Sequence, residues 1–203
     1  MRVASICARA GVVLREEGLR SFWFKVLGET VYRRMVVMEL LVPLERRPTG
    51  PPVAGAVLRL VRQDDLDAYA DLRGGHAEAR KALALGERCL GTWLDGRLLT
   101  THWFADRVAR IEPLDRTIPL EHGEAYVHGV FVAAHARRGG LGRYATVAVA
   151  AALEDEGFRR MVAVFDPENV AGRRLAERSG YRIVGTLGCV KLGPWRRDFG
   201  SLD

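Results

Sequence analysis

The sequence predicts an α/β protein with a mixed, mostly antiparallel sheet flanked by helices. Short apolar runs of strand composition recur along the chain, helical segments lie between them, and one Asp-Gly pair marks a tight hairpin. After an N-terminal segment the order is a strand, two helices, three antiparallel strands, and then strand–helix–strand–helix–strand. That order requires a crossover between parallel strands within an otherwise antiparallel sheet.

The first half of this pattern is marked by turn and capping residues. Asp64 is a suitable N-cap, Gly86 ends a short helix, and Asp95-Gly96 is the strongest hairpin signal in the chain. We expect a strand at 57–62, helices at 64–73 and 76–86, and two strands within 89–105.

The second half contains the crossover. A helix from Leu141 to Glu156 stops at Gly157, and a second helix starts at Asn169 and stops at Gly180. Strands are expected before, between and after these helices, at 124–132, 161–165, 181–186 and 187–193.

The chain divides near Gly55 into an N-terminal extension with a Pro-rich linker, 1–54, and a main domain, 55–203. Within the extension, 19–31 has apolar residues at helical spacing and 33–42 has strand composition. The helix is amphipathic, aromatic and basic, which suits an anionic membrane surface or a carrier protein. The alternatives are packing on the main domain and a contact in a homodimer.

The composition of the chain limits the classes of function that it can have. The chain has 203 residues, 48% of them hydrophobic, and a net charge of +6. It has three separated cysteines, five scattered histidines and no apolar window long enough to span a membrane. We therefore expect a cytoplasmic protein with no metal site, which would be peripheral to the membrane if the N-terminal helix binds there. Nucleic-acid binding is not expected, because no recognition motif accompanies the charge.

The stretch "ARRGGLGRYA" at 136–145 lies between a strand and an apolar helix. Glycines let the backbone wrap an anion, the helix start offers free N–H groups, and Arg137, Arg138 and Arg143 add charged donors. This pattern favours phosphate binding over a plain turn with solvated arginines.

Part of the same stretch also matches a dinucleotide-binding fingerprint. Gly140 to Ala145 fits G-x-G-x-x-A, and Asp166 follows near the expected spacing. However, seven residues separate Val132 from Gly140, and the motif lies late in the chain, which supplies no further strand–helix units after Asp203. The dinucleotide interpretation is therefore weak.

Taken together, these features resemble the GNAT superfamily of acyl-CoA-dependent N-acyltransferases over about 55–192. The family's pyrophosphate loop, Gln/Arg-x-x-Gly-x-Gly/Ala, corresponds to Arg137 through Gly142, and Val132 is the apolar residue that ends the preceding strand. A second family block corresponds to Asn169, Gly172, Arg174, Glu177, Gly180 and Tyr181.

The resemblance implies acetyl-CoA or another acyl-CoA as co-substrate and a small-molecule or peptide amine as acceptor. The strand end would pair with the pantetheine arm, the loop would hold the pyrophosphate, and the second helix would contact the arm and the adenosine. The implied binding residues are Phe131, Val132, Arg137, Arg138, Gly139, Gly140, Leu141, Gly142, Arg143, Asn169 and Arg174.

Acyl transfer to an amine needs a base, which many relatives place on the strand before the loop. Tyr126 and His128 stand six and four residues before Val132, and Glu124 lies two residues further back on the same face. Histidine titrates near neutrality, so His128 is the leading candidate, with Glu124 and Tyr126 as alternatives. Each could instead be an ordinary half-buried strand residue.

Other positions complete these expectations. Relatives often carry a tyrosine that acts as the general acid where this chain has Ala176. Tyr181, Cys189 or solvent would therefore protonate the leaving thiolate in this chain. His102 and Trp103 could line an acceptor pocket or pack in the sheet. We expect direct attack in a ternary complex; the alternative is a non-catalytic module that binds acyl-CoA or a partner. The acceptor and acyl chain length stay open.

Overall fold

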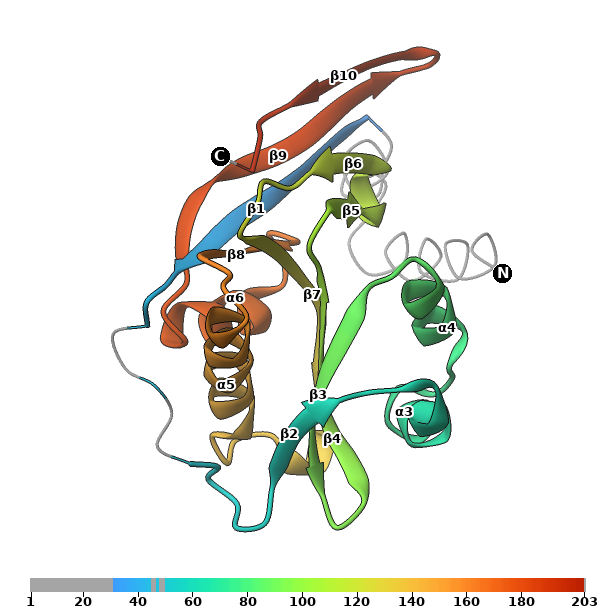
Figure 1. Ribbon diagram of the computed structural model, residues 1–203. Coiled ribbons are helices and arrows are strands. Elements are labelled where there is room, and N and C mark those ends of the chain that lie inside the picture. The colour runs from blue at the N-terminus through green and yellow to red at the C-terminus, as the bar shows by residue number, and fades with distance from the viewer. Residues whose placement is uncertain (1–30, 45–46, 48–49, 203) are drawn as a thin grey trace, which may run out of the picture.

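The computed structural model describes residues 31–44, 47 and 50–202. This part of the chain forms one eight-stranded sheet in the order β10-β9-β1-β8-β7-β4-β3-β2, and a separate hairpin, β5–β6 (Figure 1). The strands are β1 (Tyr32–Leu41), β2 (Val57–Leu60), β3 (Arg88–Leu94), β4 (Arg97–Ala105), β5 (Val108–Ile111), β6 (Arg116–Pro119), β7 (Glu124–Val132), β8 (Arg160–Phe165), β9 (Arg182–Leu192) and β10 (Trp195–Phe199). The helices are α3 (Leu66–Arg73), α4 (Ala77–Ala84), α5 (Leu141–Asp155) and α6 (Val170–Arg178), with 3₁₀ turns η1 (Gln63–Asp65), η2 (Glu112–Leu114) and η3 (Ala134–Ala136).

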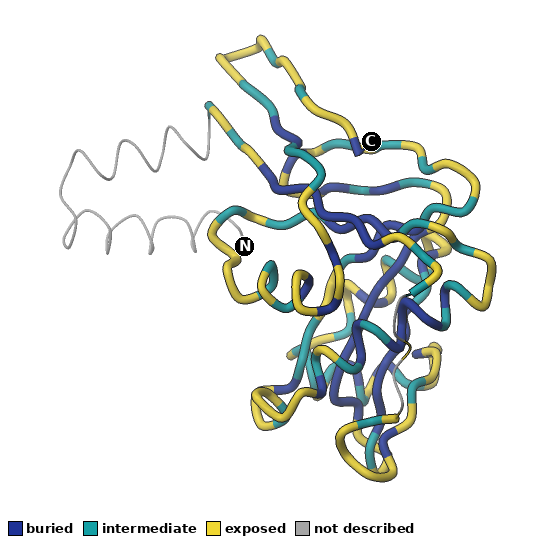
Figure 2. The backbone as a smooth tube through the Cα atoms, turned by 90° about the vertical axis from the view of Figure 1, so that its left-hand side faces the viewer, coloured by how far each residue is buried: buried dark blue, intermediate teal, exposed yellow. Residues whose placement is uncertain are grey.

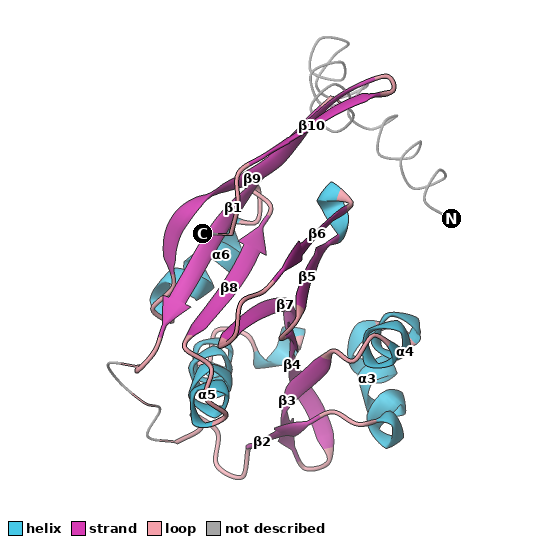
Figure 3. Ribbon diagram, turned by 45° about the horizontal axis from the view of Figure 1, so that its top comes forward, coloured by secondary structure: helices cyan, strands magenta, loops and turns pink. Residues whose placement is uncertain are grey.

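The two faces of the sheet are covered differently (Figures 1 and 3). On one face, Val149 and Leu153 of α5 and Ala176 of α6 join a buried cluster with Phe104 and Met161 of the sheet. On the other face, α3 and α4 share one cluster with β3 and β4, and the β5–β6 hairpin shares another with β1, β7 and β8. The predicted fold class is confirmed: β7 and β8 are the parallel pair, and the other paired strands are antiparallel.

Strand β1 lies inside the sheet, between β8 and β9. Six consecutive residues from Met35 to Leu40 are buried, as expected of a strand covered on both faces (Figure 2). The predicted strand at 33–42 is therefore part of the main sheet, and the division near Gly55 runs between two of its strands. Strand composition does not reveal which strands will be neighbours. The predicted helix at 19–31 and the membrane or carrier contact at 1–50 rest on residues that lie mostly outside the described part of the chain.

Four strands differ from the sequence prediction. β9 is continuous through the expected break between 186 and 187, because both segments pair with β1. The β5–β6 hairpin and β10 were not predicted, since "VARI", "RTIP" and "WRRDF" are short and interrupted by arginine, aspartate or proline. The hairpin matters below because it supplies Arg110.

Candidate active site

The parallel strands β7 and β8 separate part-way along their length. Their pairing runs from Glu124 opposite Arg160 to Tyr126 opposite Val162, and goes no further. Beyond Tyr126, β7 remains paired with β4 on its other side as far as Val132. The edge of β7 that faces β8 is therefore unpaired after Tyr126, and its backbone groups are available to an extended ligand.

A bulge in β7 adjoins this open edge. Trp103 of β4 lies opposite His128, whereas Thr101 lies opposite Phe131, so β7 carries one extra residue between them. Gly129 accommodates the bulge with a left-handed φ of +57°, and a Cβ there would lie 2.7 Å from the ring of Trp103. The glycine is thus required both by its φ and by the close ring.

The predicted phosphate loop lies at the start of α5. Gly140 is its N-cap with φ +79°, and no side chain caps the helix. Gly142 packs closely beneath the loop, because a Cβ there would lie 3.2 Å from Val132 and 3.6 Å from Leu175. A Cβ at Gly139 or Gly140 would meet no atom within 4 Å. The backbone at 139–140 therefore borders open space, in which an anion could lie near the uncapped start of α5.

The three loop arginines have different surroundings. Arg137 folds back, donating from Nε to the carbonyl oxygen of Val132 at 3.1 Å, and its guanidinium lies 5.6 Å from the centre of the Phe131 ring. Arg138 adopts a left-handed φ of +69° and is exposed. Arg143 is exposed on the first turn of α5. The Val132 carbonyl, predicted to pair with a ligand, is thus engaged by Arg137 in the free protein.

The start of α6 follows the end of β8. The side chain of Asn169 accepts a hydrogen bond from the backbone N–H of Gly172 at 3.0 Å, which caps the helix as predicted. A Cβ on residue 172 would collide with that side chain, which explains the glycine. Arg174 is exposed on the same helix.

The face of β7 opposite α5 carries a polar cluster around His128. His128 Nε2 lies 3.0 Å from Glu87 Oε2, and Arg110 Nη1 donates to Glu87 Oε1 at 3.1 Å. The His128 ring stacks on that of Tyr126, with centroids 5.3 Å apart. The side chain of His128 is 30% exposed, whereas that of Glu87 is 7% exposed. Two of the three predicted proton-transfer residues therefore lie together, beside two residues that the sequence analysis missed.

Charge and burial set the ionisation of this cluster. Burial alone would raise the pKa of Glu87, but the hydrogen bond and charge of His128, together with Arg110, outweigh it and lower that pKa below its ordinary value. Burial and the negative charges of Glu87 and Glu112 raise the pKa of Tyr126. Glu87 is therefore a carboxylate near neutral pH, and Tyr126 is a neutral phenol with little tendency to act as a base.

Glu124 belongs to a separate ion network. Its Oε1 accepts from Arg160 Nη1 at 2.6 Å and its Oε2 accepts from the backbone N–H of Glu121 at 3.0 Å. Arg160 also binds the buried Glu39 and the carbonyl oxygen of Leu202. Both oxygens of Glu124 are engaged at the paired end of β7, which favours a structural role.

His102 and Trp103 do not share a pocket. Adjacent strand residues point to opposite faces, so Trp103 packs with α3 and donates to the Tyr69 hydroxyl at 3.2 Å. His102 lies completely buried beneath α5, with Nε2 3.2 Å from Thr146 Oγ1. Burial lowers the pKa of His102 to about 4. Of the two alternatives, His102 therefore packs in the core of the sheet and does not line an acceptor pocket.

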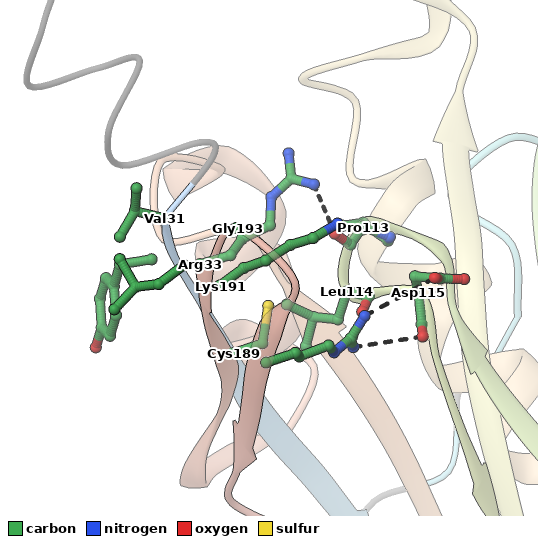
Figure 4. A pocket seen from close by; sticks show the side chains of 11 residues that line it. Val31, Arg33, Pro113, Leu114, Asp115, Cys189, Lys191 and Gly193 are labelled. Carbon is green, nitrogen blue, oxygen red and sulfur yellow. Dashed lines mark hydrogen bonds and ion pairs between the residues drawn. The ribbon is translucent and has the colours of Figure 1, made fainter.

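The proposed substitutes for the missing tyrosine are placed elsewhere. Ala176 and Tyr181 lie in the same buried cluster, and burial raises the pKa of Tyr181. Cys189 lines a cavity of about 600 Å³ between β1, β9 and η2, with no β7 residue in its lining (Figure 4). Arg33, which also lines that cavity, donates a hydrogen bond to the carbonyl oxygen of Pro113 (Figure 4). Neither Tyr181 nor Cys189 therefore lies at the open edge of β7.

Comparison with known proteins identifies the family. The sequence model of the Acetyltransferase (GNAT) family matches residues 61–181. The chain belongs to this family. The predicted resemblance is confirmed, and β1 lies outside the matched region although it is part of the sheet.

Solved structures show the same GNAT fold at low sequence identity. A GNAT-family protein from Novosphingobium aromaticivorans has 18% identity and a TM-score of 0.52, covering 77% of this chain and 62% of its own. The GCN5-related N-acetyltransferase from Sphaerobacter thermophilus has 17% identity and a TM-score of 0.55, covering 88% and 56%. The glucosamine N-acetyltransferase region of a fungal multi-domain β-N-acetylglucosaminidase has 11% identity and a TM-score of 0.59, covering 81% and 21%. This chain thus spans less than two thirds of each of these proteins.

No curated protein matches the chain. None of the helices within the described residues is both long and apolar enough to cross a membrane.

Proposed function

We propose that this GNAT-family chain transfers an acetyl group from acetyl-CoA to an amine. The observation that carries the proposal is the unpaired edge of β7 beyond Tyr126, which is followed, after the short segment 133–140, by the uncapped start of α5. An extended arm can pair with that edge while its phosphates lie on the helix N-terminus.

The residues present fit such a substrate. The N–H groups of 138–143 would hold the pyrophosphate, because Gly139 and Gly140 leave space where a side chain would otherwise lie. Arg138 and Arg143 are exposed and would supply charged donors, and Arg137 would release Val132 to reach the same anion. Asn169 caps the start of α6 shortly after the end of β8, and Arg174 is exposed in the middle of that helix.

His128 is the base in this proposal. His128 lies two residues past the last β7 residue that pairs with β8, and its side chain is partly exposed. It takes a proton from the attacking amine directly or through one water. The amine nitrogen forms a C–N bond to the thioester carbonyl carbon, and the C–S bond breaks with its electron pair on sulfur. Solvent protonates the thiolate, since Tyr181 is buried in the core and Cys189 lines a separate cavity.

A substitution at Gly139 tests the site. Gly139 has no left-handed φ and no neighbour within 4 Å of a Cβ, so Gly139→Asp should fold normally. It places a carboxylate where the pyrophosphate would lie, and we expect acetyl-CoA affinity to fall at least tenfold by titration calorimetry. Ala134→Asp adds the same charge on the exposed turn η3 and should change affinity less than twofold.

The same preparation distinguishes the alternatives. Release of CoA in the presence of a panel of peptides, amino sugars and polyamines would support the enzyme. Acetyl-CoA binding without release on any amine would favour a non-catalytic binding module. Binding of NADH in place of acetyl-CoA would overturn the proposal in favour of a dinucleotide site.

A further inference from the structure

Among the residues that the structure describes, Glu87 is the buried carboxylate that contacts His128, and no sequence motif pointed to it. It follows Gly86 and precedes β3, and its backbone N–H donates to the carbonyl oxygen of Ala82 at 3.0 Å. Arg88 lies opposite Phe104, and Ala105 lies opposite Tyr126, so Glu87 lies level with the end of β4. Its side chain reaches across β4 to β7, where it meets His128.

The contact restricts the imidazole. A carboxylate only accepts hydrogen bonds, so the His128 Nε2 atom at 3.0 Å must carry the hydrogen. In the neutral ring the other nitrogen, Nδ1, then has a free lone pair that can take a proton. Stacking on Tyr126 holds the plane of the ring.

We propose that Glu87 is a positioning residue, which holds His128 in the Nε2–H tautomer so that Nδ1 serves as the base. This inference rests on the proposed function. Arg110 from β5 donates to the second Glu87 oxygen and keeps the carboxylate in place. Glu87 itself is a poor base, because it is buried and held between two donors.

The charged and titratable groups around the pair come from several elements. Arg110 of β5 and His128 of β7 contact Glu87, and Tyr126 stacks on His128. The negative charge of Glu112 in η2 contributes to the raised pKa of Tyr126, and Glu112 also pairs with Lys81 of α4. The negative charge nearest His128 among them is that of Glu87. Its removal leaves the Nε2–H group of His128 without this carboxylate acceptor.

The test combines NMR with kinetics. In the wild type, ¹⁵N spectra of the His128 ring should show the Nε2–H tautomer in the neutral state; a dominant Nδ1–H tautomer would overturn the inference without any variant. In Glu87→Gln, which keeps the size of the side chain, we expect kcat/KM to fall about tenfold or more. The neutral His128 ring should also lose its preference for the Nε2–H tautomer in the ¹⁵N spectra, because the side-chain NH₂ can donate to Nε2 where the carboxylate only accepted. Glu78→Gln on the exposed surface of α4 should leave both unchanged.

The outcomes separate the two proposals. A lower rate in Glu87→Gln with the Nε2–H tautomer of His128 retained means a purely structural role and overturns the inference while acetyl transfer stands. A wild type that shows the Nε2–H tautomer but never releases CoA overturns the proposed function, and with it the role of Glu87 in proton transfer.

Discussion

His102 and His128 lie on neighbouring strands of one sheet, yet their surroundings differ in every respect that matters for proton transfer. His102 is fully buried beneath α5 and its partner is the neutral hydroxyl of Thr146. His128 is partly exposed at the separation of β7 and β8, and its partner is a carboxylate. Residue type alone therefore does not make a strand histidine a candidate base. Access to the open strand edge and an ionised partner distinguish the two.

The largest expected effect is on turnover. His128→Ala removes the proposed base, and a positioned base contributes about 10²–10⁴ in rate. We therefore expect kcat to fall by at least tenfold while acetyl-CoA affinity changes little. His122→Ala, which removes an exposed histidine from the loop before β7, is the matched control and should keep full turnover. Equal turnover in His128→Ala and the wild type would rule out His128 as the base.

The second effect concerns stability and belongs to His102. Burial lowers its pKa to about 4 from about 6.5, so in mild acid the unfolded chain binds a proton that the folded chain does not. Stability should therefore be unaffected above the unfolded pKa and fall as the pH drops toward 4, by about 2 kcal/mol between pH 7 and pH 5. Urea unfolding at both pH values would measure this loss.

The His102→Leu variant isolates that contribution. It has no imidazole to titrate, so its stability should change between the two pH values by about 2 kcal/mol less than that of the wild type. An identical pH dependence in the two proteins would contradict the buried, neutral state of His102.

The third effect tests the bulge next to His128. Gly129→Ala forces a side chain into a left-handed φ, which costs about 1–2 kcal/mol, and places a methyl group against Trp103. Gly96→Ala carries the same kind of strain in the β3–β4 turn but meets no neighbouring atom. We expect Gly129→Ala to be the less stable variant by thermal melting, and to lose turnover. Equal stability of the two would mean that the contact with Trp103 costs nothing.

Local patterns in the sequence predicted the sheet class, the hairpin at Asp95-Gly96, the glycine loop and the cap at Asn169. Each of these depends on residues close in sequence. The contact between Glu87 and His128 could not be predicted in this way. The two residues are 41 positions apart in the sequence, and strand β4 lies between β3 and β7 in the sheet. The insertion of β1 between β8 and β9 was missed for a similar reason, since strand pairing is decided by packing on both faces.

Site prediction was uneven for the same physical reason. Alternation along β7 correctly grouped Tyr126 with His128 on one face. It also grouped Glu124 with them, although Arg160 from β8 engages that carboxylate. The distinction between a bound and an available side chain comes from partners on other strands. The predicted membrane, carrier and homodimer contacts of 1–50 stay predictions.

The most direct test of the account is amide hydrogen exchange with and without acetyl-CoA. If the open edge of β7 and the start of α5 form the donor site, exchange should slow at 127–132 and 138–143. Exchange should stay unchanged at 189–193, beside the cavity that Cys189 lines. Slower exchange at 189–193 with no change along β7 would contradict the central claim and move the binding site to that cavity.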